Sequence, residues 1–349
     1  MIFALFSINL SCGKRKVPLP PVERISQRVE IDGFQRGNQV QLSWTMPARN
    51  AADSSILNID RIDVYRLAEP LDATLTLSEE DFSSRSTLVA TLPVSNNDFA
   101  LKKFSFTDSL EFAGQPARLR YAIRFVNAAG QKAAFSNFLL IEPTAKVAGA
   151  PKSLTAEITE AAVILQWIVP ESNVDDTKPV NLLGYNVYRS ASKNEAAKLL
   201  NEAPVTKTEF SDKSFEFDTN YFYFIRSVSL GGNGNPVESL ESNIVGVLAQ
   251  DKFSPVAPSA ITIAAAPNNL SIFFAVNPEN DVAGYRIYRS LDRNTPLPQW
   301  QNLTPDLLMT NTFQDTKIES GKTYHYYLVA VDKHGNVSQP SEIVSETAP

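Results

Sequence analysis

One seven-residue phrase repeats along the chain, and this repetition constrains the fold more than any other feature. The phrase reads GYNVYRS at residues 184–190 and GYRIYRS at residues 284–290. A looser version, IDVYR, lies at residues 62–66. The two close copies begin 100 residues apart, which is the length of one ordinary domain. The sequence therefore predicts a duplicated domain rather than one large fold.

Other residues mark each copy in the same order. Each copy opens with an alternating apolar stretch that ends in a large aromatic residue, and a period of two is typical of a β-strand. After the repeated phrase come a short stretch that closes on aspartate, an aromatic-rich stretch, a turn glycine and a serine. This order predicts three copies of one β-rich unit. By copy, the marks are Trp44, Asp108, Tyr121, Gly130 and Ser136; Trp167, Asp212, Tyr223, Gly232 and Ser242; and Phe274, Asp315, Tyr326, Gly335 and Ser341.

The order and spacing of these marks resemble those of fibronectin type III domains. The resemblance covers nearly the whole chain after its first 23 residues. It implies an all-β fold of three tandem immunoglobulin-like β-sandwiches, each with seven antiparallel strands, in an elongated array. We expect these domains at residues 24–143, 144–250 and 251–349, joined by short proline-bounded linkers that limit their reorientation.

The first copy departs from this pattern in two ways. Leu119 stands where Tyr221 and Tyr324 provide the corner tyrosine of the other copies, so the hydrogen bond of that hydroxyl must be absent. The connection after its repeated phrase is also longer, and the sequence SEED at residues 78–81 predicts a capped helical turn there. We therefore expect the first copy to be the least regular domain.

Residues 1–12 resemble the end of a bacterial lipoprotein signal. An apolar run leads to the lipobox-like sequence LSCG at residues 10–13. The resemblance implies that Cys12 is lipidated and that a proline-rich tether follows at residues 13–23. The protein would then be bound to the membrane through a lipid anchor in the cell envelope, at the outer membrane and facing the periplasm or the cell surface. The alternative is a short hydrophobic N-terminus with an inert, buried cysteine.

Few residues in the chain are suited to catalysis. One cysteine and two histidines, His325 and His334, are too few for a disulfide framework, a thiol site or a His/Cys zinc site. A net charge of -6 argues against nucleic-acid binding, which needs a basic face. The acidic residues at 175–176 and 279–281 could ligate calcium, but they are better explained as turn formers. We expect no enzyme activity, no cofactor and no metal site.

Strand parity places aromatic side chains on one sheet face of the second and third copies. If Tyr223 and Tyr326 face the core, the residues one position away face outward. Contiguous outward aromatics are typical of a binding face. Two explanations without binding stay open: a β-bulge that turns the tyrosine of the repeated phrase inward, and cover from a neighbouring loop or domain. The candidate binding residues are Tyr188, Phe222, Phe224, Tyr288, His325 and Tyr327.

The repeated phrase also places an arginine at the same position in each copy, at Arg66, Arg189 and Arg289. A long basic side chain can cover apolar surface with its stem while its charged head stays in water. We expect this arrangement at the edge of each sandwich. A role in binding an anionic ligand is the second possibility.

These features together predict a non-catalytic lipoprotein of the cell envelope that acts as a spacer, a scaffold or an adhesion module. Its partner would be an unidentified envelope protein or glycan, contacted through sheet faces or loops. The alternative is a carbohydrate-binding or enzyme-accessory module in which the aromatic row stacks on sugar rings. A fold of this type hosts many functions, so the fold does not decide between the two.

Overall fold

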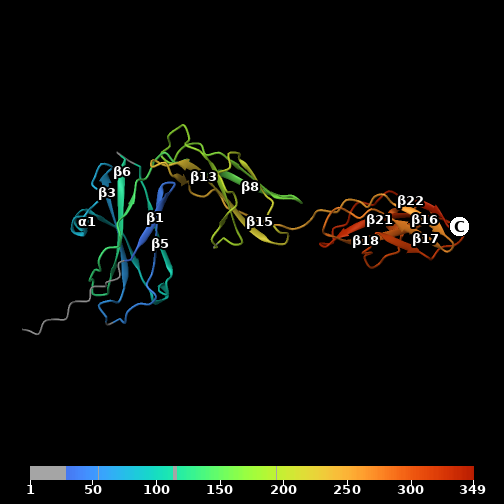
Figure 1. Cartoon of the computed structure of the whole chain (residues 1–349), viewed down its shortest axis with the longest axis horizontal. Helices are drawn as coiled ribbons and strands as arrows, with labels where there is room; N and C mark the ends of the chain where they lie inside the picture. Colours follow the sequence, from blue (N-terminus) through green and yellow to red (C-terminus); the bar gives the residue numbers. More distant parts are fainter. Residues whose placement is uncertain (1–28, 54, 113–115, 194) are drawn as a thin grey trace, which may run out of the picture. The chain divides into compact units, whose positions relative to one another are not determined.

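The computed structural model describes residues 29–53, 55–112, 116–193 and 195–349 (Figure 1). The predicted lipoprotein signal, Cys12 and the tether lie outside the described residues. The chain is all-β, as predicted, and the helices in the described part are short. None of these helices has the length and hydropathy needed to cross a membrane. They are α1 (Glu79–Arg85) and the 3-10 helices η1 (Asn96–Asp98) and η2 (Leu297–Gln299).

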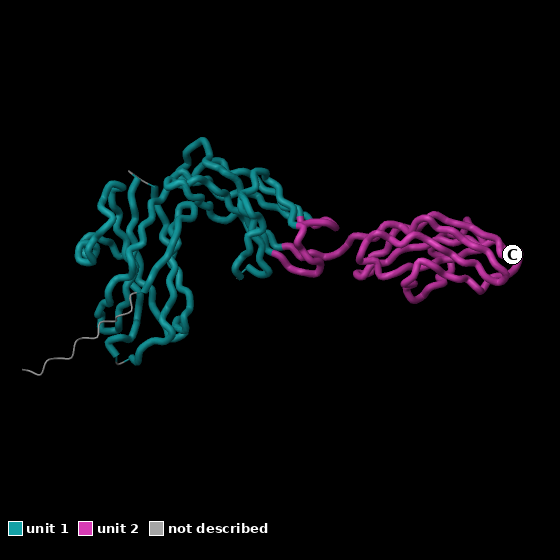
Figure 2. The backbone as a smooth tube through the Cα atoms, in the orientation of Figure 1, with its two compact units in different colours: residues 1–157, 164–212, 222–246 teal, residues 158–163, 213–221, 247–349 magenta. Residues whose placement is uncertain are grey.

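The chain divides into two compact units, coloured teal and magenta in Figure 2. The first unit comprises the described residues up to 157, together with residues 164–212 and 222–246. The second unit comprises residues 158–163, 213–221 and 247–349. By sheet membership the strands form three tandem β-sandwiches, called here the first, second and third sandwich.

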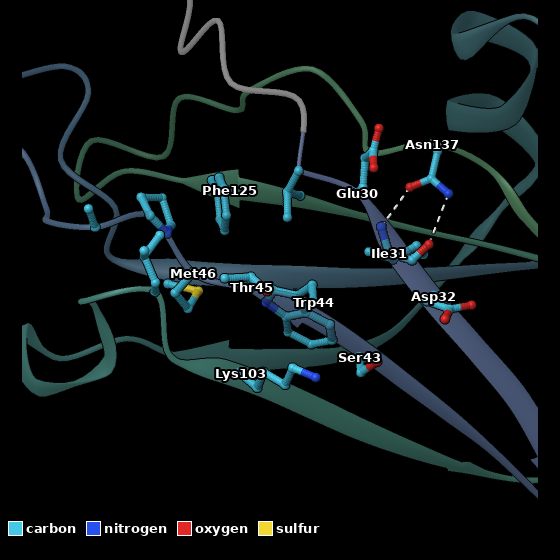
Figure 3. Close-up of a pocket in the computed structure, with 14 residues that line it drawn as sticks. Glu30, Ile31, Asp32, Ser43, Trp44, Thr45, Met46, Lys103, Phe125 and Asn137 are labelled. Carbon is cyan, nitrogen blue, oxygen red and sulfur yellow. Dashed lines mark hydrogen bonds between the residues drawn. The ribbon is translucent and has the colours of Figure 1, made fainter.

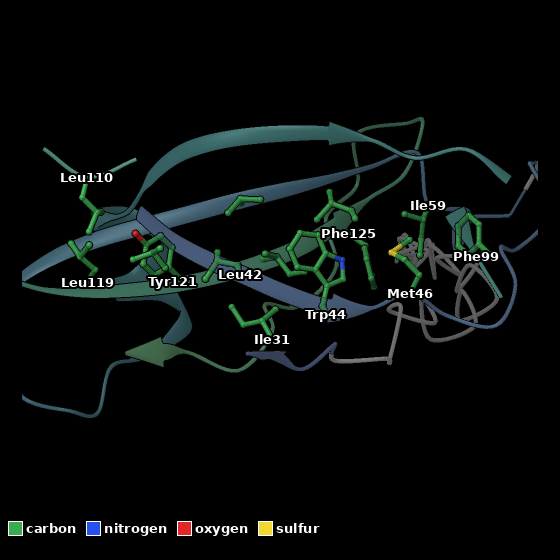
Figure 4. Packing of buried hydrophobic residues seen from close by; sticks show 14 residues of the cluster. Ile31, Leu42, Trp44, Met46, Ile59, Phe99, Leu110, Leu119, Tyr121 and Phe125 are labelled. Atoms are coloured by element: carbon green, nitrogen blue, oxygen red, sulfur yellow. The ribbon is translucent and has the colours of Figure 1, made fainter. Parts of the chain in front are cut away.

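The first sandwich packs a three-stranded sheet against a four-stranded sheet. Val40, Leu42 and Trp44 alternate along β2 and point inward, with at most 3% of any side chain exposed. They pack against Tyr121 and Phe125 of the opposing sheet (Figure 4). The alternation read from the sequence therefore builds this core. In sheet order the strands are β1 (Ile31–Arg36), β2 (Gln39–Thr45) and β5 (Lys103–Ser109), and β4 (Thr87–Pro93), β3 (Arg61–Pro70), β6 (Ala117–Val126) and β7 (Leu139–Ile141).

The second sandwich contains the first close copy of the repeated phrase as strand β10. Tyr185 and Val187 of this strand are buried, and Trp167 meets the Tyr185 ring edge-on at 5.2 Å between centroids. One sheet has the strand order β12-β9-β8, and in the other β10 and β13 are central. The strands are β8 (Lys152–Ile158), β9 (Val163–Ile168), β10 (Gly184–Ser190), β11 (Lys198–Leu199), β12 (Glu209–Asp212), β13 (Asn220–Leu230), β14 (Pro236–Glu238) and β15 (Val245–Leu248).

The third sandwich lies within the second unit and contains the other close copy in strand β18. Phe274 takes the place of the tryptophan and meets Tyr285 at 4.6 Å, so one large core aromatic replaces another. In sheet order the strands are β16 (Thr262–Ala266), β17 (Asn269–Phe273) and β20 (Thr312–Asp315), and β19 (Gln301–Asn302), β18 (Val282–Ser290), β21 (Thr323–Asp332) and β22 (Val344–Thr347).

The arginine of the repeated phrase forms an ion pair in every sandwich, so the prediction that its head stays in water was wrong. Its partner is the aspartate that closes the short strand, and a buried tyrosine donates a hydrogen bond to the same carboxylate. The aspartate side chain is at most 11% exposed, so little water can reach it to replace a lost partner. The groups are Arg66–Asp108–Tyr121, Arg189–Asp212–Tyr223 and Arg289–Asp315–Tyr326, with N–O distances of 2.7, 2.6 and 2.7 Å and O–O distances of 2.7, 2.9 and 2.8 Å.

The first sandwich has the two irregular features that the sequence predicts. In the other two sandwiches, the hydroxyls of Tyr221 and Tyr324 accept a backbone N–H from five residues upstream at 2.9 Å. Leu119 has no hydroxyl with which to do this. The predicted helical turn is α1, where the Ser78 hydroxyl accepts the N–H of Asp81 at 3.0 Å. The prediction of a capped helical turn is therefore confirmed.

Within the first unit, the first and second sandwiches share one sheet. Strand β1 pairs in parallel with β14, where Arg36 lies opposite Glu238. The path of this sheet runs β11-β10-β13-β14-β1-β2-β5. The N–H of Gly37 donates to the Glu238 carbonyl at 2.7 Å, and Gly37 has a φ of +54 that L-residues rarely adopt. This junction joins two sandwiches by main-chain hydrogen bonds.

Candidate functional site

We define the outer face of each sandwich as the side, facing away from the core, of the sheet that holds the repeated phrase. The second tyrosine of the phrase lies at its centre, and one residue of the next long strand lies directly opposite. The strands pair there without a register shift in the second and third sandwiches, so no bulge turns the tyrosine inward. The opposed pairs are Tyr65 and Ala122, Tyr188 and Phe224, and Tyr288 and Tyr327.

The outer face of the third sandwich is covered by its own chain. Trp300, at the end of η2, lies against Tyr327 with 5.2 Å between ring centroids and is 5% exposed. Its indole N–H donates to the Thr295 carbonyl at 2.8 Å. The Tyr327 hydroxyl donates to the Leu297 carbonyl at 3.2 Å. Tyr327 is therefore buried, while Tyr288 and His325 are half-buried.

The outer face of the first sandwich is covered by helix α1. Phe82 of this helix is fully buried and meets Phe135 edge-on at 5.1 Å between ring centroids. Tyr65 meets the same ring at 5.4 Å. Ala122 leaves the space that these rings fill, because its side chain is a single methyl group. The long connection of the first sandwich thus turns this face into a second small core.

The outer face of the second sandwich is only partly covered. Tyr188 and Phe224 are stacked at 4.9 Å with an interplanar angle of 12°. The Arg226 guanidinium lies 4.6 Å from the Tyr188 ring centroid and 4.9 Å from that of Phe224. Phe224 is 8% exposed, but Phe222 is half-buried, with the Lys193 ammonium 5.9 Å from its ring centroid. Cations therefore lie beside all three rings of this face.

A carboxylate at the edge of this face ties it to the junction. Glu238 accepts hydrogen bonds from Asn186, from the Tyr188 hydroxyl and, at 3.1 Å, from Arg226. Arg36 of the first sandwich lies 3.6 Å from the same carboxylate. Burial opposes ionisation of Glu238, but these hydrogen bonds and the charge of Arg226 outweigh it and hold its pKa below the ordinary value. Glu238 is therefore an anion shared by the two sandwiches.

The two arginines differ in how well they are neutralised. Arg226 also binds Glu241 at 2.7 Å, and its pKa is raised: burial lowers it, but hydrogen bonding to Glu241 and the charge of Glu238 outweigh burial. Burial, followed by repulsion from Arg226, lowers the pKa of Arg36. The nearby carboxylates therefore outweigh the effect of burial for Arg226 but not for Arg36.

A cavity of about 210 Å³ opens beside these residues. Phe222 and Phe224 line it together with three basic side chains, two glutamates (Glu195 and Glu241) and Ile244. The cavity is several times larger than the roughly 30 Å³ that one water molecule occupies. The lining residues used below are Arg36, Tyr188, Lys193, Phe224, Arg226 and Ile244.

A larger depression of about 890 Å³ lies at one end of the first sandwich (Figure 3). Glu30, Asp32, Lys103 and Asn137 line it, and Asn137 binds the backbone of Ile31 with 2.7 and 2.9 Å hydrogen bonds. The buried indole N–H of Trp44 in its wall has no hydrogen-bond partner among the described residues. The indole of Trp167, at the same position of the second sandwich, shares this property. The lone indole is thus a feature of the position and does not indicate a ligand.

The acidic residues considered for calcium are used in turns. Asp175 accepts hydrogen bonds from the N–H and hydroxyl of Thr177, and Glu279 accepts the N–H of Val256 at 2.7 Å. A different group of three could offer ligand atoms within 4.8 Å of one another, namely Asp251, Asp332 and His334 in the second unit. Asp332 is already occupied by the backbone N–H groups of its own turn, as in an ordinary Asx turn.

Sequence reasoning found the rings of the outer face but missed the residues that complete it. Parity gave Tyr188, Phe222 and Phe224, because alternation along a strand is visible in the sequence. Glu238 and Arg36 belong to different sandwiches, and no local pattern indicates that they meet. Trp300 was also missed, although the sequence does carry a signal for it. A single tryptophan in the connection after the repeated phrase indicates a ring that could cover this face.

No protein-family model matches the chain. Exoglucanase B of Cellulomonas fimi is 28% identical over 194 residues, which is 54% of this chain but only 16% of that protein. The crystal structure of the chicken CNTN1 FN1-FN3 domains aligns with 91% of this chain and 98% of that chain, at 14% identity and a TM-score of 0.28. The described sheets by themselves show tandem β-sandwiches.

Proposed function

We propose that the protein is a non-catalytic spacer and scaffold of the cell envelope. The observation that carries this proposal is the junction between β1 and β14, where pairing at Arg36 and Glu238 links the two sandwiches into one sheet. A spacer must resist bending between its domains, and a shared sheet does this better than a linker alone. The covered outer faces of the first and third sandwiches support the same role, because their aromatic residues serve packing.

Lipidation of Cys12 would attach this spacer to a membrane. The support is the lipobox-like sequence LSCG at residues 10–13 and the proline-rich stretch that follows it. Incorporation of labelled palmitate into the wild type, and its loss in Cys12→Ser, is the expected result. A wild type that takes up no label would contradict the lipid anchor but would leave the spacing role intact.

A carbohydrate-associated accessory role is the second candidate. The observation that favours it is the local similarity to part of an exoglucanase, an enzyme many times longer than the matched segment. Against a sugar-stacking role, Arg226 lies over Tyr188 and Phe224 of the second sandwich, and Trp300 covers Tyr327 of the third. Sugar rings need open aromatic faces, so this candidate stands second.

The spacing role is tested by a distance measurement across the shared sheet. Spin labels at Ser105 of β5 and Lys198 of β11, both exposed and at opposite edges of the sheet, are placed in a Cys12→Ser chain. We expect a narrow distance distribution, and a broader one after Glu238→Ala. Glu202→Ala, at an exposed glutamate away from the junction, is the matched control. A broad distribution in the unaltered junction would overturn the proposal.

The accessory role is tested separately with soluble glucans. Cellohexaose is titrated against the full chain, and reducing ends are measured after prolonged incubation. The spacing role predicts neither binding nor release. Saturable binding would support the accessory role, and released reducing ends would overturn the non-catalytic assignment.

A further inference from the structure

The residues around Trp300 in the third sandwich have direct counterparts in the second. Trp300 lies in a cluster with Tyr327 and Val329 of β21, and with Tyr288 and Ile343. By strand register, Tyr188 corresponds to Tyr288. Phe224 and Arg226 correspond in the same way to Tyr327 and Val329. Ile244 corresponds to Ile343, because each isoleucine lies two residues after a serine whose hydroxyl accepts a backbone N–H of the long strand. All four counterparts line the 210 Å³ cavity of the second sandwich.

The second sandwich lacks the aromatic residue that its neighbours use at this place. The first sandwich supplies Phe82 and the third supplies Trp300, each from the connection after the repeated phrase. In the second sandwich the corresponding connection, residues 191–197, reads ASKNEAA and contains no aromatic side chain. Lys193 and Ala197 of this connection instead form part of the cavity wall. The cavity thus lies where the other two sandwiches place a ring.

The cavity walls suit an uncharged aromatic ring. Three basic side chains line the cavity beside two glutamates, Glu195 and Glu241, and a guanidinium or ammonium attracts the face of an aromatic ring. Phe222 and Ile244 supply the apolar contact that such a ring needs.

We propose that the cavity on the outer face of the second sandwich receives one aromatic side chain from a partner protein, seated as Trp300 is seated in the third sandwich. A single inserted ring fits the cavity, whereas a glycan would need the ring faces that Arg226 already covers. Arg36 reaches the cavity from the first sandwich, so the partner would dock across the junction. The inference goes beyond the spacing role, which stands even if the cavity takes no ligand.

The test uses N-acetyltryptophanamide as the probe and the amide resonances of Phe222, Ile244 and Gly246 as the readout. We expect saturable shifts in the full chain with a dissociation constant on the order of 1 mM, as for a small fragment. Ala197→Trp should fill the cavity from within and weaken probe binding at least about tenfold. Ala196→Trp, which adds the same ring beside the cavity but not in its wall, should leave binding unchanged.

Trp300→Ala provides an internal positive control, because it opens the matching cavity in the third sandwich. In this variant the probe should also shift amides of β21. A probe that binds the opened third sandwich but not the second would overturn the proposal. So would equal binding to wild type and a folded Ala197→Trp, or shifts caused by cellohexaose and not by the probe, which would make the cavity a glycan site. If Ala197→Trp does not fold, Phe222→Ala replaces it, and undiminished binding there would likewise overturn the proposal.

Discussion

The outer faces of the second and third sandwiches share the same strand positions but are completed by different means. In the third, Trp300 and the 3-10 helix before it lie over Tyr327 and turn the face into a buried cluster. In the second, Arg226 lies over the stacked rings and a cavity remains. An aromatic sheet face is therefore core or surface according to the connection that follows the repeated phrase. The strands alone do not decide this.

The largest expected difference between the two faces comes from Trp300→Ala. Removing a fully packed tryptophan should destabilise the third sandwich by about 3–5 kcal/mol. Hydrogen exchange at Leu328 and Ala330 of β21 measures the free energy of opening of this sandwich alone. Met309→Ala, at a side chain that is 77% exposed, is the control and should change little. A loss below about 1 kcal/mol would mean that Trp300 lies on this face without supporting it.

The shared core chemistry should give equal effects in both sandwiches. Asp212→Ala and Asp315→Ala each remove a buried carboxylate from a half-buried arginine and from the tyrosine hydroxyl that donates to it. We expect each change to cost its own sandwich about 3 kcal/mol. The chain has one tryptophan in each sandwich, so fluorine-labelled tryptophan gives a separate unfolding signal for each. Unequal losses would show that the two cores differ more than their common residues indicate.

Much of this fold could be predicted because its determinants are local and repeated. Alternation gave the strands, the SEED sequence gave α1, and Leu119 marked the missing corner hydrogen bond. The aspartates that close the short strands were also noted, but their pairing with the arginines was not. That pairing joins residues 42, 23 and 26 positions apart, and repetition alone does not show which marks touch.

The candidate site was harder to predict than the fold. Its rings follow from parity, but its charge cluster depends on a parallel pairing of β1 with β14. Edge pairing of this kind has no sequence periodicity of its own, because any exposed edge can offer its backbone groups. Burial of an outer-face ring also depends on the connection after the repeated phrase, and the path of that connection follows no sequence periodicity. The sequence thus indicated a row of aromatics and left its cover undecided.

Acid should weaken the second sandwich through Glu238, a contribution that the third sandwich lacks. Glu238 has a lowered pKa in the folded chain, so the stability it contributes is fully present above the unfolded glutamate pKa of about 4.3 and is lost as the pH falls through the lower folded value. The loss is read from the fluorotryptophan signal of Trp167 in urea as the pH is lowered. The third sandwich has Val329 in place of Arg226 and no such cluster. Glu238→Gln should remove this pH dependence; a variant that keeps it would point to another carboxyl.

The smallest expected effect comes from a single hydroxyl on the covered face. Tyr327→Phe removes the hydrogen bond to the Leu297 carbonyl, which helps hold η2 and Trp300 over the ring. We expect a loss of about 1 kcal/mol, because the partner is a neutral backbone group at 3.2 Å. The reciprocal change, Phe224→Tyr, adds a hydroxyl where the second sandwich has no equivalent helix, so hydrogen exchange should show no gain there. Phe224→Tyr could instead stabilise the second sandwich by as much as Tyr327→Phe destabilises the third. That result would mean that the hydroxyl does not need the 3-10 helix as its hydrogen-bond partner. The connection would then matter less to these faces than the position of Trp300 indicates.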